Sequence, residues 1–360
     1  MSKKDFKVFK VGAVFNSLSK KSLCVKPVFK RVELLYPSRL NAMALDPSKI
    51  AKNKNLCYSP GEIIFKVKIY KKVVIEIIPE NKSVIISERS KRKSLITHAV
   101  LLMKKGLKIN DGFFIDVDNR KEIKHAGLGS SSGLISSVAC AINELYGNPI
   151  ERDDLIKYLA QNHGEETENE NFLSPVQCIG GSAAAGLYGG ALLIIAGESV
   201  VISSRNISKN YKAVIGIPND FKELSADVLL KKEIKSFGKF IKTGEKFSQL
   251  IAYRLLHNVL PSLEAGRLNE IGDLIYDYRF KMGSIENCSY AYSKLPKIAE
   301  KLKILKNSKI AKVLSISSVG PAFFAITEKS KECKKMFERE NLKTFVVDIE
   351  NEGYTILKKE

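Results

Sequence analysis

The first two hundred residues contain several stretches in which hydrophobic and polar positions alternate, a pattern typical of half-buried β-strands. These stretches are also rich in valine, isoleucine and aromatic residues. They predict strands over residues 31–41, 62–79, 82–88 and 111–119. We interpret the second and third of these strands as a hairpin or a meander.

Other stretches space their apolar residues as an amphipathic helix does. They predict helices over residues 93–109, 133–147 and 152–166, and a long helical region over 246–283. A segment of small residues at 180–197 runs into a strand, and further strands are predicted at 211–220, within 311–328 and at 344–350, where we expect the last strand of the chain. Strands and helices occur in separate runs rather than in strict alternation, so the predicted fold class is α+β.

The composition is that of a globular protein long enough to form two lobes. Of 360 residues, 44% are apolar and 27% are charged. No apolar run reaches the roughly 18 residues of a membrane span, and the first 30 residues lack the apolar core of a secretory signal. Six cysteines without a C-x-x-C pair argue against a zinc site or a disulfide framework. We therefore expect a cytoplasmic protein without a membrane partner.

The net charge of +20 comes from lysine spread over the whole chain. Such a surface attracts phosphate-bearing molecules, although it also serves solubility alone. Nucleic-acid binding is not predicted, because the sequence has neither an aromatic RNA-binding platform nor a zinc finger. Residues 1–30 hold eight lysines and one acidic residue. We expect them to lie outside the core, as a mobile basic arm that is open to disorder or as an over-extended start of the chain, and to be dispensable for activity.

Residues 127–133, GLGSSSG, gather glycines and serines immediately before a predicted helix. Glycine allows backbone conformations that a side chain blocks, and a helix start offers free N–H groups and the positive end of the helix dipole. The segment therefore predicts a cradle for a phosphate group. It is not a P-loop, because no G-K-[ST] follows. The alternative is a flexible turn with a serine N-cap.

The segment HAGLGSSSG at 125–133, opening a small-residue helix, resembles the second motif of the GHMP kinase superfamily, whose members include galactokinase and homoserine kinase. In that superfamily this loop wraps the nucleotide phosphates. One branch, the archaeal β-ribofuranosylaminobenzene 5'-phosphate synthases, is similar in more detail. Its motifs P-S-R-[IL]-H-x-x-L-[IL]-D, H-x-G-L-G-S-G-T and S-S-x-G-P look like residues 36–46, 125–132 and 317–321, and residues 59–67 sit where the branch has a glycine-rich strand.

This resemblance covers about residues 31–330 and implies a two-lobed fold of the GHMP kinase type. The N-terminal lobe would be like ribosomal protein S5 and the C-terminal lobe ferredoxin-like. We place the basic extension at 1–30, the phosphate-binding lobe at 31–205 and the second lobe at 206–360. The resemblance also implies a transferase.

The branch implies a particular reaction, the condensation of p-aminobenzoate with phosphoribosyl pyrophosphate during synthesis of a methanopterin-type cofactor. The first alternative is an ATP-dependent kinase of the same fold acting on a small sugar or acid. The second is a family member that binds nucleotide without catalysis.

Several departures from the family pattern bear on this choice. Asn41 stands where the branch has histidine, and GGSAAAGL at 180–187 replaces its G-G-T-S-G-I-G. The P-S-G-x-x-D segment that carries the catalytic aspartate of the kinases is missing. The glycine-rich third motif is reduced to SSVGPAFF at 317–324. The motifs therefore support phosphate binding better than they support phosphorylation of an acceptor.

The resemblance assigns candidate residues to each role. The catalytic candidates are Arg39 as an anion clamp, Asp46 as a magnesium or hydroxyl ligand, and His125 as a phosphate contact or acid. The phosphate or nucleotide would be held by Gly127, Leu128, Gly129, Ser130, Ser131, Ser132 and Gly133. The substrate would contact Ser38, Asn41, Gly180, Gly181, Ser182, Ser317, Ser318 and Gly320.

Each of these residues also has a plain structural interpretation. Arg39 could form a surface ion pair, Asp46 could belong to a turn before a proline, and His125 could be an exposed loop residue. The glycines and serines at 180–182 and 317–320 could serve only helix packing and a turn.

We expect Mg²⁺ as a cofactor, with ATP or phosphoribosyl pyrophosphate as substrate. Magnesium keeps several waters and needs few protein oxygens, so its site leaves little trace in a sequence. The candidate ligands are Ser130 and Glu165, the latter in an acidic run that also holds Glu166, Glu168 and Glu170 and would otherwise be solvated. The expected partner is a small anionic substrate bearing a phosphate. The sequence leaves the oligomeric state open, a homodimer included.

Overall fold

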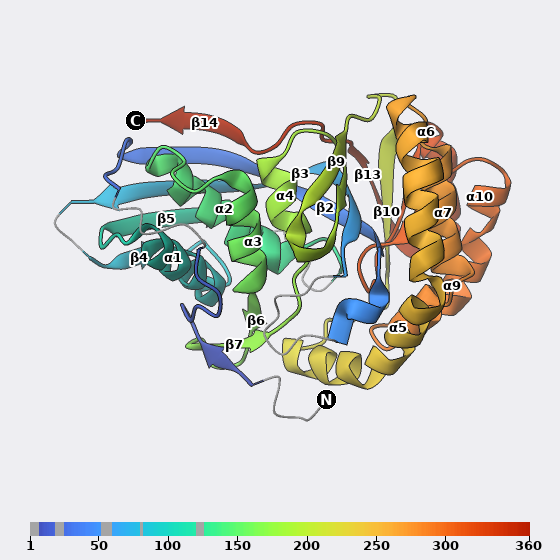
Figure 1. Cartoon of the computed structure of the whole chain (residues 1–360), viewed down its shortest axis with the longest axis horizontal. Helices are drawn as coiled ribbons and strands as arrows, with labels where there is room; N and C mark the ends of the chain where they lie inside the picture. Colours follow the sequence, from blue (N-terminus) through green and yellow to red (C-terminus); the bar gives the residue numbers. More distant parts are fainter. Residues whose placement is uncertain (1–6, 19–24, 52–59, 80–81, 120–125) are drawn as a thin grey trace.

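The computed structural model describes residues 7–18, 25–51, 60–79, 82–119 and 126–360, and Figure 1 shows their arrangement in two lobes. His125 lies outside these residues. The first lobe is built on a mixed sheet in the order β14-β2-β3-β5-β4, with β8 and β9 attached to β3. Its strands are β2 (Arg31–Ala44), β3 (Glu62–Ile78), β4 (Val84–Ile86), β5 (Gly112–Asp118), β8 (Leu192–Ile195), β9 (Val201–Arg205) and β14 (Thr355–Lys359).

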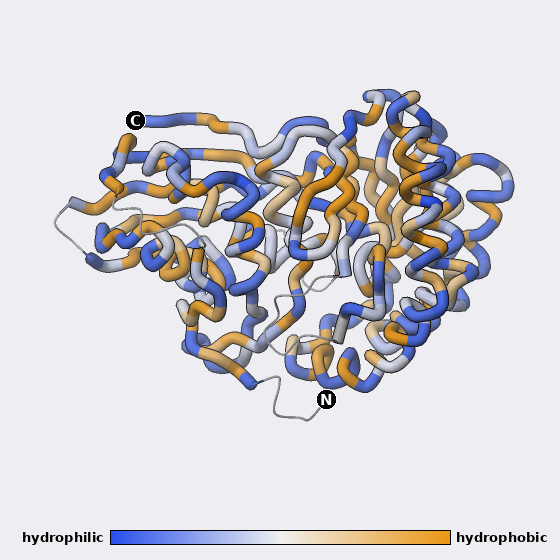
Figure 2. Tube along the Cα trace, viewed as in Figure 1, coloured by the Kyte–Doolittle hydropathy of each residue, from blue (hydrophilic) through white to orange (hydrophobic). Residues whose placement is uncertain are grey.

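Four helices pack on this sheet, and the apolar periodicity of the sequence accounts for the first three. They are α1 (Lys93–Leu107), α2 (Ser130–Leu145), α3 (Arg152–Gln161) and α4 (Gly181–Leu187). A small three-stranded sheet in the order β1-β7-β6 lies beside them, made of β1 (Phe9–Lys10), β7 (Phe172–Pro175) and β6 (Gly164–Glu166). The tube in Figure 2 shows the apolar residues concentrated in the sheet and on the helix faces that cover it. Burial of these faces stabilises the lobe.

The second lobe has an antiparallel sheet in the order β11-β12-β10-β13 covered by helices. The strands are β10 (Lys212–Pro218), β11 (Val313–Ile316), β12 (Phe323–Thr327) and β13 (Leu342–Asp348). The helices are α5 (Ala226–Arg254), α6 (Leu260–Glu264), α7 (Asn269–Phe280), α8 (Ser284–Cys288), α9 (Leu295–Leu302), α10 (Ile304–Asn307) and α11 (Ser330–Arg339). A hydrophobic core between the lobes joins residues of β2, β3 and β8 to residues of β10, β12 and α7. The lobes therefore share buried surface.

Two strand predictions were wrong in their pairing. The strand predicted at 82–88 does not form a hairpin with β3, because β4 pairs with β5 in parallel register. Residues 344–350 do not close the chain either. After β13 the chain returns to the first lobe, where β14 pairs with β2 (Figure 1). Residues 206–360 were expected to form the second lobe, but their last strand, β14, belongs to the sheet of the first lobe.

The described part of the basic extension differs from the mobile arm expected from its charge. Strand β1 pairs with β7, with Phe9 opposite Leu173, and the Phe9 side chain is buried. The Gly12 N–H donates to His98 Nδ1 at 2.9 Å, and the Phe15 N–H donates to Asn162 Oδ1 at 2.6 Å. Residues 7–18 are therefore packed onto the first lobe.

Candidate functional site

The glycine–serine loop, residues 127–132, is held in a conformation that glycine favours. Gly127 has φ +86° and Gly129 has φ +68°, the left-handed region in which side chains are strained. A Cβ on Gly127 would lie 2.2 Å from the carbonyl oxygen of Ser317. A Cβ on Gly129 would lie 2.8 Å from Ser182 Oγ and 3.1 Å from Arg39 Nε. The loop thus threads between β2, α4 and the second lobe, and only a bare backbone fits.

The loop leads directly into α2, and the N-terminus of this helix faces a cleft. The Gly133 N–H makes the first helical bond, to Gly129 O at 2.9 Å, so the N–H groups of the preceding turn have no intrahelical acceptor. The first turn contains no acidic residue and no side chain caps it. The positive end of the helix dipole and free donors therefore point toward the space that Ser130, Ser131 and Ser132 line.

Arg39 brings a guanidinium to the front of this loop. It lies on β2 just after a register shift at Pro37 and Ser38, where a proline is tolerated in a strand because the ladder is interrupted. Its Nη1 donates to Gly127 O at 3.1 Å. Its Nε is buried and has no hydrogen-bond partner among the described residues. A cation with an unsatisfied donor therefore borders the cleft beside the helix start.

A buried carboxylate, Glu62, lies beside Arg39 at the first residue of β3. Glu62 Oε1 accepts the Gly181 N–H at 2.8 Å, and Oε2 accepts a hydrogen bond from the Asn41 side chain. Burial raises the pKa of Glu62, while the charge of Arg39 and the two hydrogen bonds work against that rise. The site thus contains an acid whose proton affinity its neighbours control.

Arg92 holds the loop from behind. Its side chain is 1% exposed, and the residue precedes α1 with φ +64°. Nη1 and Nη2 donate to Ser130 Oγ at 3.2 Å and Ser131 Oγ at 2.6 Å. The same guanidinium donates to Glu165 Oε2 at 3.2 Å and Glu166 Oε2 at 2.6 Å. One arginine therefore joins the start of α2 to strand β6.

The second lobe closes the site through the loop between β11 and β12. Ser317 Oγ donates to Gly127 O at 2.6 Å and accepts the Asn41 N–H at 3.0 Å. The Ser318 N–H donates to Asn41 O at 2.9 Å. These bonds fix the glycine–serine loop against β2. The first turns of α5 add Leu229, Leu230 and Glu233 to the wall of the cleft.

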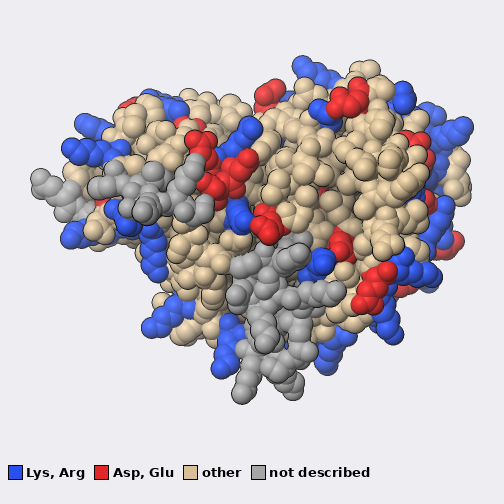
Figure 3. All heavy atoms as spheres, viewed as in Figure 1, with Lys and Arg blue, Asp and Glu red and all other residues tan. Residues whose placement is uncertain are grey.

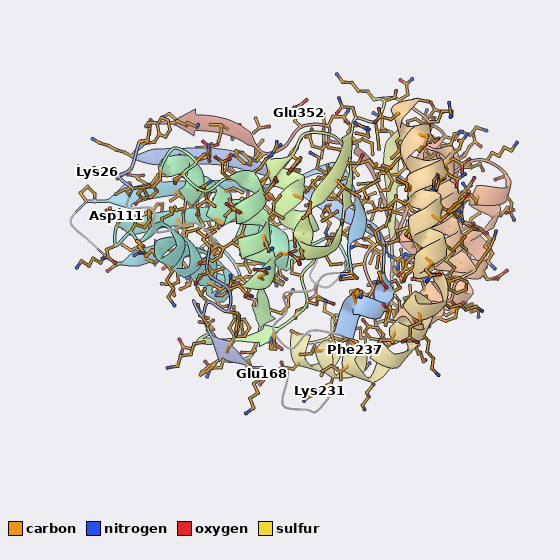
Figure 4. The ribbon with its side chains drawn as sticks, in the orientation of Figure 1. Lys26, Asp111, Glu168, Lys231, Phe237 and Glu352 are labelled. Carbon is orange, nitrogen blue, oxygen red and sulfur yellow. The ribbon has the colours of Figure 1, made fainter. Side chains whose placement is uncertain are left out.

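The cleft between the lobes contains about 1010 Å³ of space not filled by protein atoms, part of which is open solvent at its mouth. Figure 3 shows basic side chains around the outer edge of one face of the molecule and acidic side chains gathered where the lobes meet. Figure 4 labels Glu168 between β6 and β7, and Lys231 and Phe237 on α5, which all lie at the lower edge of that view.

The structure brings most of the candidate residues from the sequence to this cleft. The lining includes Arg39, Asn41, Gly127, Gly129, Ser130, Ser131, Ser132, Glu165, Gly181, Ser182, Ser318 and Gly320. Ser317 stands behind the lining and ties the loop to β2. The nearby Leu128 is partly buried against the core between the lobes. Gly180 starts α4, buried Ser38 lies in β2, and a Cβ on Gly133 would meet Lys71 Nζ at 3.1 Å. Their assigned roles stay predictions.

Asp46 is the candidate that the structure places elsewhere. Its Oδ1 accepts hydrogen bonds from the Ser48 N–H at 3.0 Å and the Ser248 hydroxyl at 2.6 Å. It joins the end of β2 to α5 and does not line the described cleft. Its carboxylate satisfies a turn before Pro47, the plain interpretation of that residue.

Other residues of the site were missed by sequence reasoning. They are Glu62, Arg92, His163, Gln177, Cys178 and Glu233. Glu62 comes directly after a glycine at the start of a long apolar strand, and a carboxylate at such a position is a signal that could have been read. Nothing in the sequence around Arg92 distinguishes it from the neighbouring basic residues Arg89, Lys91 and Lys93.

The residues present fit a bound phosphate and its magnesium ion. The glycine cradle and the helix start suit phosphate oxygens. No cluster of three or more His, Cys, Asp or Glu side chains suited to a metal occurs in the described part of the chain. Ser130 Oγ and the Glu165 carboxylate are hard oxygen donors at the cleft, the type that Mg²⁺ takes when phosphates supply the remaining ligands.

Part of the sequence matches a known protein family. The family model described as "GHMP kinases N terminal domain" matches residues 94–172. No curated protein matches the sequence. Within the described residues, none of the helices has the length and apolar character needed to cross a membrane.

Solved structures with the same fold cover most of the chain. Homoserine kinase from Cytophaga hutchinsonii is 17% identical with a TM-score of 0.58, over 93% of this chain and 100% of that one. Lactococcus lactis galactokinase complexed with galactose is 12% identical with a TM-score of 0.64, over 91% and 95%. MDDEF in complex with MVAPP, AMPPCP and magnesium is 12% identical with a TM-score of 0.57, over 91% and 99%. These likenesses confirm the predicted α+β fold of the GHMP kinase type. Residues 94–172 therefore match the model of a GHMP kinase N-terminal domain, within a fold that the chain shares with solved structures of kinases.

Proposed function

We propose that this protein is a magnesium-dependent kinase that transfers the terminal phosphoryl group of ATP to a hydroxyl of a small molecule. The observation that carries the proposal is the convergence of three groups on one cleft. These groups are the start of α2, the partly unsatisfied guanidinium of Arg39 and the buried carboxylate of Glu62. They match the needs of phosphoryl transfer, which depends on positioning and on stabilising negative charge.

Each group has a role in this reaction. The N–H groups at the start of α2 hold the phosphates of ATP, and Arg39 stabilises charge on the transferred group. Glu62 accepts the proton of the acceptor hydroxyl as its oxygen forms a bond to phosphorus and the bond from phosphorus to ADP breaks. Ser130 and Glu165 would hold Mg²⁺, which neutralises charge on the phosphates.

The synthase chemistry implied by the branch resemblance is the competing proposal. The structures reported above include two kinases, and one holds the ATP analogue AMPPCP with magnesium. A carboxylate placed to accept a hydroxyl proton also favours the kinase. The departures at Asn41 and at 180–187 weaken the match to the synthase branch in the same region of the site.

The test supplies both donors in parallel. One arm contains ATP, Mg²⁺ and small hydroxyl compounds, starting with homoserine and galactose, and measures ADP release. The other contains phosphoribosyl pyrophosphate, Mg²⁺ and p-aminobenzoate, and measures pyrophosphate release. We expect acceptor-dependent ADP release and no pyrophosphate. Pyrophosphate release without ADP would overturn the kinase proposal, and binding of ATP without release in either arm would favour a non-catalytic role.

A further inference from the structure

The guanidinium of Arg92 lies at the back of the glycine–serine loop and is extensively hydrogen-bonded. With the described residues it makes four hydrogen bonds of 2.6 to 3.2 Å, two to serine hydroxyls of α2 and two to carboxylates of β6. The side chain is 1% exposed and Arg92 does not line the described cleft. Direct contact between Arg92 and a ligand in the cleft is therefore excluded by burial.

The serine hydroxyls, in contrast, do line the cleft. A hydroxyl has one proton and can accept through its oxygen lone pairs. Because Arg92 donates to Ser130 Oγ and Ser131 Oγ, each hydroxyl keeps its own proton for another acceptor. The direction left open for that proton is toward the cleft, where a phosphate oxygen would accept it.

The positive charge of Arg92 offsets the negative charges of the Glu165 and Glu166 carboxylates. Two negative charges close to the start of α2 would repel an anion in the cleft. Arg92 contacts both carboxylates, and His163 Nε2 lies 3.8 Å from Glu165 Oε1. The planar guanidinium meets four oxygens at once, which the single ammonium of lysine cannot do in this geometry.

We propose that Arg92 is a positioning residue for the phosphate site: it turns the Ser131 hydroxyl into a donor toward the bound anion, holds Ser130 Oγ in place, and balances the negative charge of Glu165 and Glu166. The inference rests on the proposed function in that the anion is taken to be the polyphosphate of a nucleotide. It also accounts for an arginine at φ +64°, a backbone conformation in which glycine or asparagine is favoured.

The experiment measures binding by calorimetry with two probes, ADP and inorganic pyrophosphate, each with and without Mg²⁺. The variants are Arg92→Lys and Ser131→Ala. The control is Arg89→Lys, a half-exposed arginine of the same segment that binds Asp116 and does not line the described cleft. We expect Arg92→Lys to weaken binding of both probes on the order of tenfold, and Arg89→Lys to leave it within twofold.

The double variant separates positioning from a merely structural role. If Arg92 acts through the hydroxyls, Arg92→Lys should weaken binding much less in a Ser131→Ala background than in the native protein. A structural role would lower the melting temperature and leave this coupling at zero. Ser131→Ala also keeps the inference testable if Arg92→Lys does not fold, because loss of the hydroxyl alone should weaken binding severalfold.

The outcomes distinguish this inference from the proposed function. Binding of pyrophosphate but not ADP by the native protein would overturn the kinase proposal, and the same variants would then test Arg92 with pyrophosphate alone. A folded Arg92→Lys protein that binds both probes normally would overturn the inference. Failure of the native protein to bind either probe would overturn both.

Discussion

Two arginines hold the glycine–serine loop, Arg39 at its front and Arg92 at its back, and they differ in how far the protein satisfies them. Arg92 is buried with four hydrogen bonds, whereas Arg39 donates to one backbone carbonyl and keeps a buried Nε without a described partner. A buried donor left unpaired costs about 1–3 kcal/mol, so it is retained where a ligand can complete it. We therefore expect Arg39, at the front, to contact the ligand and Arg92, at the back, to preorganise the loop.

The largest expected effect comes from the carboxylate beside Arg39. Glu62→Gln keeps the size of the side chain but removes the proton acceptor, so kcat should fall about 10²- to 10³-fold with a small change in the affinity for ATP. The control is Glu76→Gln, on the same strand but paired with Arg31. Steady-state kinetics of both variants measure the effect. A Glu62→Gln enzyme with native kcat would remove Glu62 from the chemistry.

His98 lies on α1, the helix that Arg92 precedes, and it should affect the free energy of unfolding and not the binding of a ligand. Burial lowers the pKa of His98 to about 4, and the hydrogen bond to Asn162 O opposes this only in part. The neutral ring accepts the Gly12 N–H at Nδ1. A histidine with a depressed folded pKa contributes stability that is present above its unfolded pKa of about 6.5 and is lost as the pH falls toward 4. The loss should approach about 3 kcal/mol.

Urea unfolding between pH 7 and pH 4 tests this stability. The slope of stability against pH should flatten in His98→Gln and persist in His257→Gln, where the histidine is exposed. Equal slopes in the two variants would contradict a role for His98. Affinity for ADP at pH 7 should stay native in both.

Arg39→Lys separates ligand contact from structure at the front of the loop. Lysine keeps the charge but loses the fork that pairs with a phosphate or carboxylate, so kcat/KM should fall by about 1–3 kcal/mol of transition-state stabilisation. The melting temperature should change little, because only the Gly127 carbonyl loses a described partner. Lower stability with native kinetics would instead make Arg39 a structural residue.

The smallest effect concerns the loop itself. Gly129→Ala adds a Cβ 2.8 Å from Ser182 Oγ and 3.1 Å from Arg39 Nε at φ +68°. Gly266→Ala is the matched control, since Gly266 has φ +71° and no atom within 4 Å of the added Cβ. Both should lose about 1 kcal/mol of stability from backbone strain. Only Gly129→Ala should also weaken ADP binding, because its Cβ displaces the front arginine. Equal binding by the two variants would argue against close packing of Arg39 on the loop.

The sequence alone determined the local features of this protein. Alternation and helical spacing located β2, β3, α1, α2 and many other elements, and the glycine–serine run located the loop that leads into α2 at the cleft. These signals are local, because strand and helix periods and the backbone freedom of glycine are properties of neighbouring residues. Motif resemblance added Arg39 and Ser318, which line the cleft, and Ser317, which stands behind its lining.

Only the tertiary structure decided which distant residues meet. Glu62 and Arg39 approach each other because β2 and β3 are paired strands whose register shifts on both sides of Arg39. The return of β14 to β2 depends on contacts more than 300 residues apart in sequence. Asp46 shows the opposite case. It occupies a motif position, yet its carboxylate accepts hydrogen bonds from its own turn and from Ser248 of α5 and does not line the described cleft. Arg92 was one basic residue among several until folding buried it between α2 and β6. Burial and pairing across the chain are set by packing, which no short pattern encodes.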